Sequence, residues 1–114
     1  YEKENMGEQR AMQEFVEEGG FVYREQVTIE VNGLRIRPDF IGYKDNTLYI
    51  FEIKNGPKAG FTHNQKIVIP QIIQNSPKFY PIGENAKWIP EFNNLIINNK
   101  PYTGDYIFVI KHDY

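Results

Sequence analysis

The chain has 114 residues, enough for one domain with a modest core but too few for two. Its 13 basic and 15 acidic residues give a net charge of -2, so it lacks the long-range positive field that marks many passive nucleic-acid-binding modules. Cysteine is absent, which excludes disulfides, thiolate zinc sites and cysteine nucleophiles. No apolar run reaches the roughly 18 residues that a membrane-spanning helix needs, so no membrane partner is predicted.

The first predicted element is a helix over residues 6–18. Apolar residues recur there at spacings of three and four, which is the pattern of a helix with one buried stripe. The members of this stripe are Ala11, Met12, Phe15 and Val16. Gly19-Gly20 is a typical stop signal after such a helix.

Three strands in a meander are predicted next. The stretch "FVYREQVTIEVNGLRIRPDF" reads as two strands joined at Asn32-Gly33, a strong signal for a two-residue hairpin turn. A second turn at Asp45-Asn46 leads into the third strand, "TLYIFEIK".

The second half of the chain predicts a helix, a long connection and a final strand. Thr62 and Gln65 have the spacing of a capping box, and Pro70 is expected to kink or end the helix behind it. The region 75–94 is rich in Pro, Asn and Gly and is expected to be irregular, with a short strand at residues 95–97 before the last strand, "DYIFVIKH". The order of elements predicts an α+β or α/β domain, a mixed central sheet with an antiparallel three-strand meander flanked by helices.

Three charged residues interrupt the apolar strands. Side chains alternate along a strand, so Glu52 and Lys54 share one face of the third strand. If Asp45-Asn46 form the turn, Lys44 opposes Thr47, and the same register places Asp39 directly opposite Glu52. Two opposed carboxylates repel unless a cation lies between them, which Mg²⁺ or Mn²⁺ would supply.

Lys54 then has three possible roles: to orient the attacking water, to help deprotonate it, or to neutralise charge on a scissile phosphate. The competing interpretation is a surface charge ladder, in which Arg37 and Lys54 relieve the two carboxylates.

Pro38-Asp39, followed at the end of the next strand by Glu52-Ile53-Lys54, resembles the signature of the PD-(D/E)XK nuclease superfamily. The helix, meander and helix around it resemble that superfamily's restriction-endonuclease-like core, over residues 6–74. The resemblance implies a nuclease with Mg²⁺ or Mn²⁺ as its cofactor. Asp39 and Glu52 would be metal ligands, the carbonyl of Ile53 a further ligand, and Lys54 the catalytic lysine.

Glu8 and Gln65 each have a functional and a structural interpretation. Many members of the superfamily add an acidic residue from the first helix, and Glu8 shares the buried stripe there, which implies a further metal ligand. The alternative is a frayed first turn, where acidic residues suit the helix dipole. Gln65 resembles the glutamine that follows the Glu-x-Lys strand in the superfamily and reaches the active centre or the nucleic acid, and the capping box with Thr62 is its alternative role.

The implied activity is hydrolysis of phosphodiester bonds in a nucleic-acid substrate by an Mg/Mn-dependent endonuclease. DNA is slightly favoured over RNA, including tRNA, because the superfamily mostly cuts DNA. The alternatives are a non-catalytic nucleic-acid- or protein-binding module on the same fold, and an unrelated α+β domain that carries the motif by accident.

A small nuclease-like chain that begins without Met also resembles the C-terminal toxin domains of bacterial contact-dependent growth inhibition and other polymorphic toxin systems. This resemblance implies that residues 1–114 are one nuclease-like domain from a longer protein. Such domains are secreted or delivered from the cell surface, act in the cytoplasm of the target cell, and are neutralised by a cognate immunity protein.

Overall fold

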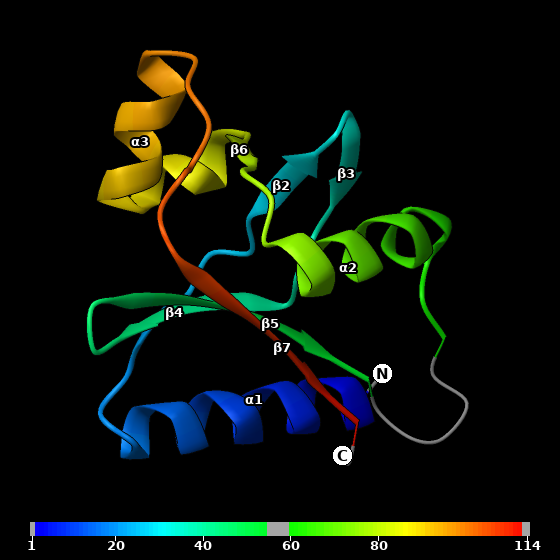
Figure 1. Cartoon of the computed structure of the whole chain (residues 1–114). Helices are drawn as coiled ribbons and strands as arrows, with labels where there is room; N and C mark the ends of the chain where they lie inside the picture. The colour runs from blue at the N-terminus through cyan, green and yellow to red at the C-terminus, as the bar shows by residue number, and fades with distance from the viewer. Residues whose placement is uncertain (1, 55–59, 113–114) are drawn as a thin grey trace.

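The computed structural model describes residues 2–54 and 60–112, with side chains described from Met6 onward. It contains helices on both sides of a central sheet (Figure 1). The elements in chain order are α1 (Glu2–Glu17), β1 (Phe21–Tyr23), β2 (Thr28–Val31), β3 (Leu34–Ile36), β4 (Phe40–Lys44), β5 (Thr47–Ile53), α2 (His63–Asn75), β6 (Tyr80–Ile82), the 3₁₀ helix η1 (Glu84–Trp88), α3 (Pro90–Ile97) and β7 (Tyr106–Lys111). Within the described part of the chain, no helix is both long and apolar enough to cross a membrane.

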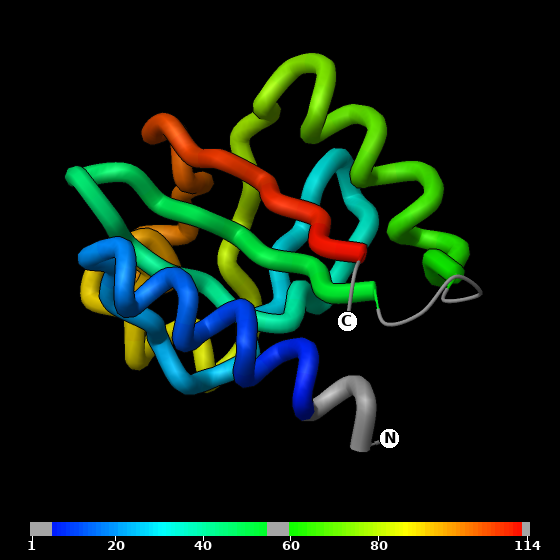
Figure 2. The backbone as a smooth tube through the Cα atoms, turned by 90° about the horizontal axis from the view of Figure 1, so that it is seen from below, coloured from blue at the N-terminus to red at the C-terminus, as the bar shows by residue number. Residues whose placement is uncertain are grey.

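The strands form two sheets. The larger has the order β1-β4-β5-β7, and the smaller has the order β3-β2-β6. In the larger sheet β4 is antiparallel to β1 and β5, whereas β7 is parallel to β5, and Figure 2 shows β5 and β7 running side by side in the same direction. The predicted α+β class with a mixed sheet and flanking helices is therefore confirmed.

The predicted meander differs in one respect, because its strands are divided between the two sheets. The hairpin at Asn32-Gly33 forms, with Val31 paired to Leu34, but it belongs to the smaller sheet together with β6. The chain leaves the larger sheet after Tyr23 and returns at Phe40, so its three antiparallel strands are β1, β4 and β5. The polar stretch at residues 24–26 marks the first crossing in the sequence.

The β4–β5 hairpin has the predicted register. Asp45 and Asn46 have φ of 52° and 61°, as a two-residue turn with positive φ at both positions requires. Pairing begins at Lys44 and Thr47 and continues without a break to Phe40 and Phe51. This register decides which side chains reach the end of β5 together.

The larger sheet separates two apolar clusters. On the side of α1 lie Ala11, Phe15, Phe40, Phe51 and Ile53. Residues that alternate with these, including Ile41, Leu48 and Ile50, face the main cluster, which is completed by α2 and the smaller sheet. Figure 1 shows this arrangement as α1 on one side of the sheet and α2 on the other.

The first helix is longer at its start than predicted, and its stripe is narrower. It begins at Glu2 and ends at Glu17, before Gly19 with φ of 94°. Ala11 and Phe15 are buried and Met12 is half-buried, but Val16 is 55% exposed. The prediction that Val16 faces the core is wrong, because it lies on the flank of the helix.

The region after β5 holds more regular structure than predicted. Helix α2 continues through Pro70, which lies exposed inside it, so this proline does not end the helix. The expected irregular connection contains β6, η1 and α3, and residues 95–97, predicted as a strand, are the last turn of α3. Pro90 at the first turn of α3 explains the difference, because its fixed φ favours a helix start.

Candidate functional site

The candidate site lies at the end of β5, on the face turned towards α2. Glu52 and Lys54 are 6% and 8% exposed, although both carry charged groups. The Lys54 Nζ lies 3.1 Å from Glu52 Oε2. The surface charge ladder is therefore wrong for Glu52, because a carboxylate buried to this degree needs a partner inside the protein.

Asp39 is held against the backbone at the end of β5. Its N–H donates to the Phe51 carbonyl at 2.9 Å, and its carboxylate Oδ2 accepts the Ile53 N–H at 2.6 Å. The regular pairing thus ends at Phe40, one residue before the predicted Asp39–Glu52 pair, and the Asp39 side chain takes the place of the next backbone acceptor.

The same contact orients the Ile53 backbone. The N–H and C=O groups of one strand residue point towards the same neighbouring strand. The Ile53 N–H donates to Asp39, so the Ile53 carbonyl also points towards the Asp39 side of β5. A metal ion bound by this carbonyl, as predicted, would have to lie on that side.

Three oxygen atoms surround the Lys54 ammonium. This group has three N–H donors. Besides Glu52, the Nζ donates to the Gly60 carbonyl at 3.0 Å and to Gln65 Oε1 at 3.2 Å. The Phe61 ring centroid lies 4.7 Å from the same nitrogen, close enough for a cation–π interaction. With one ion pair, two hydrogen bonds and an aromatic ring around it, the Nζ is held in one position.

Gln65 has both of the roles that the sequence left open. Its backbone N–H donates to Thr62 Oγ1 at 3.2 Å, and its Oε1 accepts the Thr62 N–H at 2.9 Å, which together form the capping box of α2. The same Oε1 accepts the Lys54 ammonium. One buried amide oxygen therefore joins the start of α2 to the charged pair.

The electrostatics of the site centre on Glu52. Burial raises the pKa of its carboxyl group above the ordinary value, and the negative charge of Asp39 raises it further. Hydrogen bonding from Lys54 and Gln65 acts in the opposite direction. Asp39 and Glu52 are therefore close enough to repel, and Lys54 offsets only part of the rise in the Glu52 pKa.

This donor set fits a hard divalent cation. Two carboxylates and a backbone carbonyl are oxygen ligands, which Mg²⁺ and Mn²⁺ prefer, and Mg²⁺ usually takes only one or two carboxylates from a protein. Asp39, Glu52 and the Ile53 carbonyl would hold the ion. Glu8 is half-buried on α1, which covers the opposite face of the sheet, and no three His, Asp or Glu side chains within the described residues are grouped to hold a metal.

Sequence reasoning missed Gly60 and Phe61 as partners of Lys54. Neither has a local signal, because both come just before α2 and only the placement of α2 beside β5 brings them to the site. The capping box at Thr62 is the one sequence signal that bears on them. It marks the start of α2, and Gly60 and Phe61 come directly before that start.

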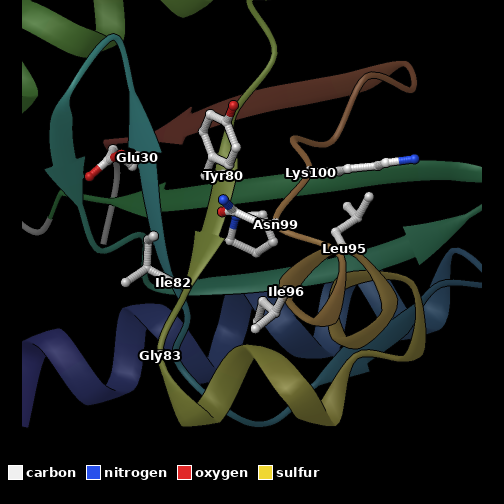
Figure 3. Close-up of a pocket in the computed structure, with 9 residues that line it drawn as sticks. Glu30, Tyr80, Ile82, Gly83, Leu95, Ile96, Asn99 and Lys100 are labelled. Atoms are coloured by element: carbon white, nitrogen blue, oxygen red, sulfur yellow. The ribbon is translucent and has the colours of Figure 1, made fainter.

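One surface cavity lies beside the smaller sheet and is not lined by the charged residues of β5. The cavity in Figure 3, of about 330 Å³, lies between β6 and α3. Tyr80, Leu95 and Ile96 contribute to its wall, with Glu30 and Lys100 towards opposite ends of the view. Neither Asp39 nor Glu52 lines it, so the charged centre is a separate feature.

The fold and site together define an α+β domain with two carboxylates and a lysine gathered at the end of a central strand. None of the protein-family models, curated proteins or solved structures compared with the chain matches it.

Proposed function

We propose that the chain is a metal-dependent nuclease of the PD-(D/E)XK type that hydrolyses phosphodiester bonds. The observation that supports this most directly is the buried Glu52–Lys54 ion pair beside Asp39 at the end of β5. A structural ion pair needs one carboxylate, whereas the second one here adds repulsion that a bound cation would relieve.

In this proposal each residue has one task. Asp39 and Glu52 hold the divalent ion, and the hydrogen bond from Ile53 to Asp39 fixes the orientation of that carboxylate. The bound ion would act as a Lewis acid and lower the pKa of a water molecule. Lys54, fixed by Gln65 and the Gly60 carbonyl, supplies positive charge to the phosphate during attack rather than removing a proton.

The substrate is DNA or RNA, with DNA slightly favoured by the superfamily resemblance. Because the chain resembles the C-terminal domains of bacterial polymorphic toxins, we propose that it acts as such a toxin. It would be delivered into the cytoplasm of the target cell and neutralised by an immunity protein.

The test incubates the protein with plasmid DNA and with total tRNA, in the presence of Mg²⁺, Mn²⁺ or a chelator. Glu52→Gln and Lys54→Met are expected to lower cleavage by at least about 100-fold, as loss of a transition-state contact does. Glu30→Gln is the matched control, because it breaks an ion pair of 3.1 Å with Arg35 in the smaller sheet. Cleavage that survives the chelator, or equal activity in all three variants, would contradict the mechanism. Absence of cleavage of either substrate would favour the non-catalytic binding module.

A further inference from the structure

The outer edge of β7 is open along its length. Of the described strands, β7 is the last in the larger sheet and pairs with β5 alone, which lies on one side of it (Figure 2). The Lys54 N–H donates to the Lys111 carbonyl at 2.7 Å, so the backbone groups of Lys111 point towards β5. By alternation, those of Ile107 and Val109 do so too. The backbone groups that point outward belong to Tyr106, Phe108 and Ile110, and none of the described residues forms a hydrogen bond with them.

This edge lacks the features that normally prevent a sheet edge from pairing. Natural edge strands are typically very short, or are interrupted by Pro, by a bulge or by charged side chains. In contrast, β7 has six residues in unbroken register with β5 and carries no charge before Lys111. Its middle residues are half-buried or exposed: Ile107 (45% exposed), Phe108, Val109 and Ile110. A long apolar edge of this kind is a template for a further strand.

The sequence of β7 favours a second copy of the chain as that strand. In an antiparallel pair related by a two-fold axis, the numbers of opposed residues add to a constant, and outward-pointing residues oppose each other. If the two copies of Phe108 oppose each other, Tyr106 opposes Ile110. Ile107 then opposes Val109. Aromatic and β-branched residues therefore meet at every position from 106 to 110, and such cross-strand pairs stabilise a sheet.

The charged ends of the strand fix this register. Asp105, which is exposed, opposes Lys111 of the second copy, and the two-fold axis produces this pair twice. The Lys111 Nζ lies 3.5 Å from Glu14 Oε2 of its own chain, and its side chain is 36% exposed, so the ammonium would then face two carboxylates. A shift of the register by two residues opposes Asp105 to Val109 in one direction. In the other direction it opposes Lys111 to Ile107, so only the first pairing matches charge with charge.

We propose that two copies of the chain form a dimer by antiparallel pairing of β7, with Phe108 at the two-fold axis. The outward groups of β7 would form about six backbone hydrogen bonds, and the two larger sheets would join into one continuous sheet. A nucleic acid is a poor occupant of this edge, which carries one acidic and one basic residue. The dimer does not rest on nuclease activity, because the side chains of Asp39, Glu52 and Lys54 take no part in it.

Sedimentation equilibrium over about 5 to 500 µM protein measures the association, and the mass is expected to rise from one chain to two. Ile107→Lys places a cation in the middle of the edge and is expected to weaken the association at least tenfold. Ile97→Lys is the matched control, because it adds the same charge at a position of α3 that is 70% exposed. This control is expected to leave the association unchanged.

Charge exchange tests the register itself. Asp105→Lys and Lys111→Glu each oppose like charges in a dimer of identical chains. Each variant alone is therefore expected to associate at least fivefold more weakly than the unaltered protein. In a one-to-one mixture of the two variants, opposite charges meet again at both ends of the strand pair, and the association is expected to recover.

Hydrogen exchange of the unaltered protein decides the question even if a variant fails to fold. The outward amides of Phe108 and Ile110 are expected to exchange at least fivefold more slowly at the high protein concentration, and the inward amides of Ile107 and Val109 to change less.

Four results would overturn the proposal. These are a mass of one chain at the highest concentration, equal effects of the two Lys variants, a mixture that associates no better than its components, and association that leaves the Phe108 and Ile110 amides unchanged. The first of these results would leave the edge to a strand of another protein.

Discussion

Replacing Lys54 with Met tests whether the charged centre is held together as the contacts indicate. The substitution keeps the length and much of the volume of the side chain, so packing against Phe61 is largely retained. It removes the ammonium that Glu52, Gly60 and Gln65 share. Glu52 is then left buried beside Asp39 without a cation.

The expected cost of Lys54→Met is about 3–5 kcal/mol in the free energy of unfolding, the range for breaking a buried ion pair from one side. Glu52→Gln is expected to cost about 1–3 kcal/mol, because Lys54 keeps its contacts to Gly60 and Gln65 and the repulsion from Asp39 disappears. The variant that combines Glu52→Gln with Lys54→Met contains neither a carboxylate at position 52 nor an ammonium at position 54. Its cost should fall short of the summed single costs by about 1–3 kcal/mol.

Urea denaturation of the four proteins at neutral pH, followed by far-ultraviolet circular dichroism, measures this cycle. Similar slopes against denaturant would show that the same unfolding transition is compared. If Lys54→Met changes the stability by less than about 1 kcal/mol, or if the two single costs simply add, the pair is not buried and coupled as described.

Three further predictions concern the fold. Gly42→Ala should cost about 1–3 kcal/mol, because the added Cβ would meet the buried Phe15 ring, and Phe15→Leu should cost less in that background than in the unaltered protein. Burial raises the pKa of Tyr106 from 10 in the unfolded chain to about 12 in the folded protein, so between pH 10 and 12 the folded protein keeps a proton that the unfolded chain loses. The free energy of unfolding should therefore fall as pH rises from 10 towards 12. The fall should be less steep in Tyr106→Phe, which lacks the phenol group. Urea titrations across this pH range measure the slope, and equal slopes in both proteins would contradict the assignment. Thr62→Ala should lower stability by about 0.5–2 kcal/mol through loss of the helix cap, and equal urea midpoints in the two proteins would contradict the capping role.

Local chemistry made much of the central hairpin predictable. Asp45-Asn46 supplied a turn with positive φ at both positions, and that turn alone set the pairing from Lys44 back to Phe40. Strand alternation then placed Glu52 and Lys54 on one face. The predicted pairing of Asp39 with Glu52 failed by one residue, because the Ile53 N–H donates to the Asp39 side chain instead of to a backbone carbonyl. The alternation of apolar residues contains no information on such an exchange.

Non-local contacts decided the remaining features. The division of the strands into two sheets depends on β6 pairing with β2, which brings together residues some fifty positions apart. The proline and glycine content of residues 75–94 suggested loop, although Pro90 begins a helix. The side of the sheet that α1 covers was likewise not predictable from the apolar stripe of that helix alone.

The Oε1 atom of Gln65 gives the protein a thermodynamic coupling between helix formation and site assembly. Because this oxygen accepts from both Thr62 and Lys54, fraying of the first turn of α2 also releases the ammonium. Any ligand that draws on the fixed Lys54 charge must in return protect the amides of that turn from hydrogen exchange, since coupling between two equilibria is reciprocal. The cap of a helix is thus also a local sensor of what occupies the end of β5.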